Sequence, residues 1–142
     1  MQLRYTMACV GVAVAVASGT PTLAHHAFSA EFDSNQPIKL TGTVTRVEWI
    51  NPHAWIHMTV KRKDGATETW MVEGGTPNTL MRRGFTRESL AAGTEIVVDG
   101  YKSKDGRLRA NGRDLTFTDG RQLFMGSSGT GAPRDCRDAT ER

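Results

Sequence analysis

The chain has 142 residues, 18 lysines and arginines against 15 aspartates and glutamates, and a formal net charge of +3. This length fits one domain and is enough for an independent hydrophobic core. The basic residues are scattered among acidic ones, so the sequence lacks the dense positive surface expected of a nucleic-acid-binding protein. We therefore expect one small domain with a mixed, solvated surface and no nucleic-acid partner.

Residues 1–24 have the features of a secretory signal peptide. Arg4 gives a short positive start, residues 7–17 are apolar and mostly small, and Thr22 and Ala24 are small residues of the kind a signal peptidase reads. The apolar run is shorter than the about 20 residues needed to cross a bilayer. No later segment is apolar enough to act as an anchor. We predict cleavage after Ala24 and a periplasmic or secreted protein with no membrane anchor.

The mature chain divides into a domain over residues 25–125 and a tail over residues 126–142. The domain begins with a polar arm in which Phe28 and Phe32 are spaced for a helical turn or for docking on a core. The tail consists of small, polar and charged residues without an apolar period, which is typical of disorder. It carries Cys136, the one cysteine left after cleavage. We interpret Cys136 as a spare thiol in a monomeric protein, and the alternative is an intermolecular disulfide.

The first predicted strand begins at Pro37 and alternates apolar and polar residues as far as Val44. The phase then slips, so that Val47 and Trp49 take the apolar positions. A slip of this kind is what a β-bulge produces, and bulges bend strands around barrels. Gly42 is a second place at which the strand can bend.

The rest of the domain alternates strands and turns, with one clear helix. Thr76 is the predicted N-cap of that helix, Pro77 its first residue and Gly84 the left-handed stop, and a further helical turn is expected from Thr86. The other predicted strands cover residues 53–60, 67–73, 95–101 and 108–117, and a last extended segment covers 121–124.

This order predicts an all-β domain of five or so antiparallel strands with one short helix between strands three and four. It is the element order of an OB-fold, a small five-stranded Greek-key barrel. The alternative is a different small barrel or a sandwich.

The candidate metal ligands are the four histidines, His25, His26, His53 and His57, all of which remain after cleavage. A terminal His25 offers both its free amine and its ring Nδ1 to one ion. A third nitrogen from a strand histidine would complete a T-shaped site that suits Cu(II), with zinc as the alternative ion. Oxygen ligands are available nearby from Glu31 and Asp33.

Strand geometry limits which histidine can join the terminus. His53 and His57 are four residues apart on one strand, so their Cα atoms are about 13 Å apart and the two rings cannot easily share an ion. His53 follows a proline in a turn and adapts more readily than His57, so it is preferred. The competing interpretation is a solvated terminal pair, a capped turn at His53 and a surface position for His57.

Tryptophans suggest a second class of function. Trp49, Trp55 and Trp70 lie on or near strands one to three, a face that in OB-folds often binds ligands by stacking. With Asn51 beside them, Trp49 and Trp55 would form a binding face for a glycan, a peptide or a protein partner. The alternative is that the tryptophans belong to the core. No catalytic set stands out, so an enzyme is the least favoured reading.

Taken together, these residues resemble a family of small exported bacterial proteins that is catalogued only as a domain of unknown function. The resemblance covers the chain from Ala24 to about Leu123 and implies an OB-like barrel whose mature chain starts with the histidine pair. It implies no activity, substrate or cofactor. The motifs that carry it are His25-His26-x-Phe28, Phe32-Asp33, Gly42-Thr43-Val44, Glu48-Trp49-x-Asn51-Pro52-His53, Trp70-x-Val72-Glu73-Gly74-Gly75, Arg83-Gly84-Phe85 and Leu90-x-x-Gly93.

Overall fold

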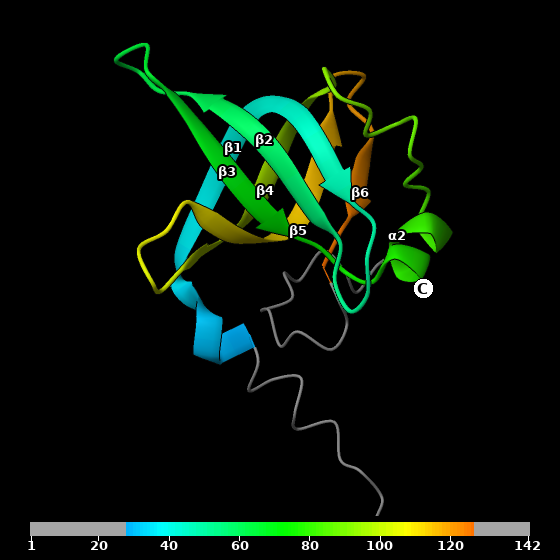
Figure 1. The fold of residues 1–142 in the computed structure, drawn as a ribbon, viewed down its shortest axis with the longest axis horizontal. Coiled ribbons are helices and arrows are strands. Elements are labelled where there is room, and N and C mark those ends of the chain that lie inside the picture. The colour runs from blue at the N-terminus through cyan, green and yellow to red at the C-terminus, as the bar shows by residue number, and fades with distance from the viewer. Residues whose placement is uncertain (1–27, 127–142) are drawn as a thin grey trace, which may run out of the picture.

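The computed structural model describes residues 28–126 as one β-rich domain (Figure 1). The predicted signal peptide, the pair His25 and His26, and the predicted tail with Cys136 lie outside the described residues. The strands are β1 (Phe32–Glu48), β2 (Trp55–Lys61), β3 (Thr67–Glu73), β4 (Glu95–Ser103), β5 (Arg109–Phe117) and β6 (Gln122–Phe124), and the helix is α2 (Pro77–Arg82).

The strands form one sheet in the order β3-β2-β1-β4-β5-β6, and each pair of neighbours in this order is antiparallel. The prediction of a mainly antiparallel β domain with one short helix after the third strand is therefore confirmed. A further, parallel pairing joins β3 to β5 over Met71–Glu73 and Arg109–Asn111. It brings the end of β3 beside the start of β5, and the candidate site lies at this junction.

Strand β1 is long and bent because it pairs with two neighbouring strands. Its first part pairs with β4 and its last part with β2, and the register shifts between Val44 and Arg46. This shift is the β-bulge that the slip in apolar phase predicted. Gly42 lies where the two pairings overlap, opposite both Val60 and Ile96.

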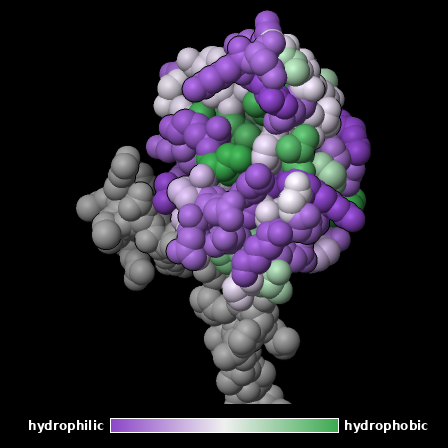
Figure 2. Space-filling model, turned by 90° about the vertical axis from the view of Figure 1, so that its left-hand side faces the viewer, coloured by the Kyte–Doolittle hydropathy of each residue, from purple (hydrophilic) through white to green (hydrophobic). Residues whose placement is uncertain are grey.

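The core lies on the inner face of the sheet and continues under α2. Trp70 and Val72 of β3 are both in it, as their alternation predicted. The outer surface is mainly hydrophilic with small apolar patches, as the face drawn in Figure 2 illustrates. The largest fully buried side chains are Val44, Ile56, Met58, Val72, Leu80, Phe85, Ile96, Val98, Asn111, Leu115 and Met125.

A second, smaller apolar cluster lies outside this core. A helical turn at residues 28–31 precedes β1, and its Phe28 ring lies 5.8 Å from the Phe32 ring and 5.7 Å from the Tyr101 ring. All three side chains are buried. The arm thus docks on the outer face of β4, as the spacing of the two phenylalanines allowed.

Helix α2 starts and stops as the sequence predicts. The Thr76 side chain accepts a hydrogen bond from the backbone N–H of Thr79, Pro77 is in the first turn, and Gly84 after the helix has φ of 97°. The turn expected from the Thr86 cap is present over residues 87–90 but does not extend into a further helix. Thr86 and Ser89 cap it, because each side-chain oxygen accepts the other residue's backbone N–H at 3.0 Å.

Candidate polar site beneath the N-terminal turn

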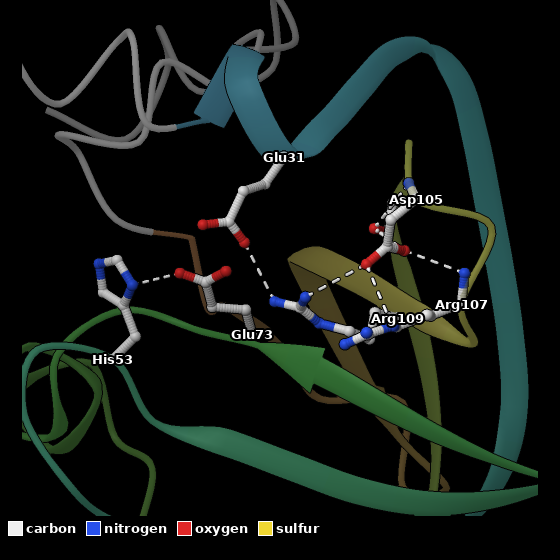
Figure 3. Close-up of polar contacts among 7 residues, drawn as sticks. Glu31, His53, Glu73, Asp105, Arg107 and Arg109 are labelled. Carbon is white, nitrogen blue, oxygen red and sulfur yellow. Dashed lines mark hydrogen bonds and ion pairs between the residues drawn. The ribbon is translucent and has the colours of Figure 1, made fainter.

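Four elements bring ionisable side chains together at one end of the sheet (Figure 3). Glu31 comes from the N-terminal turn, His53 from the segment before β2, Glu73 from the end of β3 and Arg109 from the start of β5. The parallel β3–β5 pairing sets Glu73 and Arg109 close together, because it places Met71 opposite Arg109 and Glu73 opposite Asn111.

His53 and Glu73 form the central pair of this site. The ring Nδ1 of His53 lies against Oε1 of Glu73, and the two side chains are 31% and 7% exposed. The other ring nitrogen, Nε2, points away from Glu73 in Figure 3 and has no partner among residues 28–126. A carboxylate on Nδ1 favours the tautomer that leaves a lone pair on Nε2. The pair therefore presents one free nitrogen ligand in a fixed orientation.

Glu73 is a carboxyl group in a largely buried position. Burial raises its pKa above the ordinary value of 4.5, the charge of Glu31 adds to this rise, and His53 and Arg109 oppose it. A buried carboxylate needs partners to stay charged. His53 supplies the direct contact, so the two residues depend on each other.

Arg109 joins the N-terminal turn to the sheet. Its guanidinium nitrogens lie 3.0 Å from Glu31 Oε2 and 3.6 Å from Asp105 Oδ2. The guanidinium carbon lies 5.0 Å from the centre of the Trp55 ring and 6.0 Å from that of Phe32. Arg109 thus fixes the turn beside the His53–Glu73 pair through both ionic and cation–π contacts.

Asp105 is expected to titrate below its ordinary value of 3.8. The hydroxyl of Ser103 donates a hydrogen bond to Oδ1 at 2.6 Å, the backbone N–H of Arg107 donates another, and both lower the pKa. Folding stability from this group is present above the unfolded pKa and is lost as the pH falls through the lower folded pKa. An NMR titration should show the low value, and Ser103→Ala should move it back toward 3.8. An unchanged Asp105 titration in that variant would contradict the assignment.

His57 belongs to a separate pair. Its side chain is buried, and Nε2 lies 3.0 Å from Oε1 of Glu48. The pKa of Glu48 is lowered, first by the hydrogen bond from Arg46 and also by His57. His53 and His57 therefore have different carboxylate partners.

The tryptophans do not share one set of neighbours. Trp70 is in the core, with its ring N–H donating to Glu68 at 2.9 Å. Trp49 packs against the core and lies 5.6 Å from the Arg87 guanidinium, whereas Trp55 lies over Arg109. The candidate ligand residue Asn51 is exposed in a bend and precedes Pro52 through a cis peptide bond.

A separate groove of about 490 Å³ lies at the opposite end of the strands, where β2 ends and β3 begins. Except for Thr59, whose hydroxyl is directed to the carbonyl of Thr43, the threonine hydroxyls in its wall make no hydrogen bond within the described residues. The lining residues are Thr41, Gly42, Thr43, Thr59, Lys61, Thr67, Glu95, Ile96, Val97, Thr116, Phe117 and Thr118.

Sequence reasoning singled out His53 but missed its partners. It gave no role in a site to Glu73 or to Arg109. Their only local signal is that each lies at the end of a strand. Residues 28–126 contain no group of three or more histidine, cysteine or acidic side chains placed to hold a metal ion. No helix within this range is long and apolar enough to cross a membrane.

Comparisons with known proteins place the chain in a family but give no activity. No curated protein and no solved structure matches it. A sequence profile described as a family of unknown function (DUF6152) matches residues 13–112. This range includes most of the motifs on which the resemblance was based, and the chain belongs to this family.

Proposed function

We propose that the protein is an exported, periplasmic metal-binding protein, a copper carrier or buffer that uses the mature N-terminal histidine. The amine and ring Nδ1 of His25 would supply two ligands and Nε2 of His53 the third. The observation that carries the proposal is the contact between His53 Nδ1 and the buried Glu73, which leaves Nε2 free.

This contact has the form of a carboxylate–histidine–metal arrangement. A carboxylate on the far nitrogen fixes the ring orientation and raises the basicity of the coordinating nitrogen. The Glu73 side chain is 7% exposed, so surrounding atoms of the folded domain fix its position. His53 itself is 31% exposed, so an ion can reach its free nitrogen from outside.

The proposed terminus is close in sequence to the polar site. Two residues separate His25 from Phe28, so their Cα atoms are at most about 11 Å apart. Phe28 is packed against Tyr101, and the same turn carries Glu31, which contacts Arg109 within the polar site. This short connection supports the proposal that the terminal amine and His53 share an ion.

Other candidate ligands are less favoured because their side chains already have partners. The Asp33 carboxylate accepts hydrogen bonds from the backbone of Asn35 and the side chain of Gln36, and Glu31 contacts Arg109. His57 is buried against Glu48 and remains the second choice. His26 would be a further nitrogen ligand near the terminus. Zn(II) is the alternative ion for this site.

We also propose that the domain is an OB-like barrel. Two features support it: the helix lies between β3 and β4, and the β3–β5 pairing links the sheet into the circuit β1-β2-β3-β5-β4. A barrel of this kind would hold the start of β5 beside the end of β3. The metal proposal depends on that proximity and not on closure of the barrel.

The test is a Cu(II) titration of two purified forms, one beginning at His25 and one retaining residues 22–24. The three extra residues leave every side chain in place and remove the terminal amine from the chelate ring of His25. They also keep histidine out of the second and third positions, where the amine and the backbone amides would form a different Cu(II) chelate. The first form should bind Cu(II) more tightly than the second, and Zn(II) should compete for the same site. Equal Cu(II) affinity of the two forms would refute the terminal chelate.

Processing must also give the required terminus. Cleavage after Ala24 is expected because Thr22 and Ala24 are small residues at the positions that the peptidase reads. The intact mass of the exported protein should match a chain that starts at His25. A mass that retains signal residues, or that lacks His25 and His26, would remove the basis of the copper proposal.

A second candidate function is an OB-like binding module without metal, for a glycan, a peptide or a protein partner. The threonine-lined groove favours a hydroxyl-rich ligand such as a glycan. Apart from that of Thr59, its threonine hydroxyls make no hydrogen bond within residues 28–126, and the threonine methyl groups can pack on sugar C–H faces. A glycan array would test this reading. Binding that is lost in Thr116→Val, with copper binding unchanged, would support it over the metal proposal.

A further inference from the structure

The threonine-lined groove crosses five strands of the sheet. Its wall includes Thr67 of β3 at one end and Thr116 of β5 at the other, with residues of β2, β1 and β4 between them. Neighbouring strands lie about 4.8 Å apart, so four strand spacings give the groove a length of about 19 Å along the sheet. Because its volume of about 490 Å³ is spread over that length, the groove is long and narrow.

Strand register places side chains of the groove in a row across the outer face of the sheet. Thr41 of β1 pairs with Val97 of β4, and Val97 pairs with Thr116 of β5. Ile96, directly before Val97, and Phe117, directly after Thr116, belong to the hydrophobic core. Since side chains alternate between the two faces of a strand, the row projects outward. A ligand lying across these strands therefore meets one side chain of the row from each of them.

The polar side chains of the groove have few partners of their own. Apart from that of Thr59, the threonine hydroxyls make no hydrogen bond within residues 28–126. The Lys61 ammonium and the Glu95 carboxylate likewise form no ion pair within this range. Val97 and the threonine methyl groups supply apolar contact between these polar groups. The groove thus offers donors, acceptors and C–H contacts along its length, and a chain of hydroxylated rings can satisfy all three.

The orientation of the groove favours a glycan over a peptide. An extended peptide binds a sheet by adding a strand to an open edge, where backbone N–H and C=O groups are unpaired. The strands at the centre of the groove, β2, β1 and β4, each have a hydrogen-bonded neighbour on both sides. The groove also runs across these strands and not along them. A ligand in it must therefore be recognised by side chains, which a glycan chain with its many hydroxyls allows.

We propose that the groove binds an extended linear glycan that lies across the strands, with one pyranose ring over each strand. The ring-to-ring repeat of a chain linked through two equatorial bonds is close to the strand spacing, so successive rings meet successive side chains of the row. A chain with an axial linking bond coils and leaves the row. Lys61 donates to ring hydroxyls and Glu95 accepts from them. The inference rests on the second candidate function, that of a glycan-binding module, and needs no metal.

Isothermal titration of the purified protein in the presence of EDTA tests the inference, with cellohexaose and chitohexaose as probes and maltohexaose as the control. Cellohexaose and maltohexaose contain the same glucose units, but only the cellohexaose chain is linked through two equatorial bonds, as chitohexaose is. At least one of the two equatorially linked probes should bind about tenfold or more tightly than maltohexaose. Its affinity should rise with each ring added and level off near five rings, because five strands line the groove.

Hydroxyl-deleting variants identify the contact residues. Thr41→Val and Thr116→Val keep the shape of the side chain and should each weaken binding of the preferred probe about three- to tenfold, as loss of one net hydrogen bond allows. Thr69→Val is the matched control and should leave binding unchanged, because Thr69 is an exposed threonine of β3 outside the groove wall. NMR on the unaltered protein serves where a variant does not fold: the probe should shift the amide signal of Val97 but not that of His57.

The outcomes separate the inference from the function on which it rests. Equal affinity for maltohexaose and the equatorially linked probes, or full affinity with a disaccharide, would overturn the extended chain and leave the groove as a site for other glycans. If no glycan of an array binds either, the second candidate function fails together with the inference. A peptide that shifts the groove amides when no hexaose does would also overturn it. The copper proposal is tested separately, because the groove lies at the opposite end of the strands from His53.

Discussion

Replacing Gly42 by alanine is expected to destabilise the domain by about 3 kcal/mol, at the upper end of the range for overpacking. A Cβ atom on Gly42 would lie 2.1 Å from the backbone carbonyl oxygen of Thr59. No rotamer change relieves a clash with backbone, so β1 and β2 would have to move apart. Because β1 pairs with β4 at the same residue, that movement would disturb both sides of the sheet.

Urea denaturation measures this effect, and Gly65→Ala is the control. Gly65 lies in the turn between β2 and β3 with φ of 87°, and a Cβ there would have no neighbour within 4 Å. Its replacement should cost about 1 kcal/mol, from backbone conformation alone. A Gly42→Ala protein as stable as Gly65→Ala would mean that β1 and β2 do not approach as closely as described.

Replacing His53 by asparagine is expected to weaken Cu(II) binding roughly 10–100-fold or more, since even residues that only orient a metal ligand have effects of that size. Asparagine can keep an N–H near the position of Nδ1, facing the buried Glu73, but it has no counterpart of Nε2. The substitution therefore removes the proposed ligand without leaving Glu73 unpaired. Isothermal titration with a competing chelator would measure the loss.

His57→Asn is the matched control for that experiment. His57 also has a carboxylate partner, yet it lies within β2, where it is buried against Glu48 and not beside Glu73. Copper affinity should be unchanged in this variant. Glu73→Gln should fall between the two, because it weakens the orientation of His53 but leaves Nε2 in place. Loss of Cu(II) affinity only in the His57 variant would mean that His57, and not His53, supplies the third ligand.

Sequence patterns predicted the features of this fold that depend on neighbouring residues. The bulge after Val44 was readable because a change of apolar phase is a local signal. The cap of α2 was readable because Thr76 and Pro77 act within one turn. The turn at Thr86 was readable for the same reason, since its cap is made by Thr86 and Ser89 within one turn.

The composition of the candidate site was much less predictable. Its centre depends on the parallel β3–β5 pairing, which joins residues far apart in the sequence. Apolar alternation gives the face of each strand but not its neighbour, so the proximity of Glu73 to Arg109 and Asn111 could not be inferred. The same holds for the cations beside the tryptophans, since Trp49 contacts Arg87 and Trp55 contacts Arg109, both distant in the sequence.

The most direct measurement of the central claim is the Cu(II) affinity of the protein beginning at His25 against that of a peptide of residues 25–32. The peptide has the terminal amine and His25 but no fixed third nitrogen. If the fold supplies His53, the protein should bind at least about tenfold more tightly, a difference of about 1.4 kcal/mol. Equal affinity of protein and peptide would contradict the claim, because the folded domain would then contribute nothing to the site.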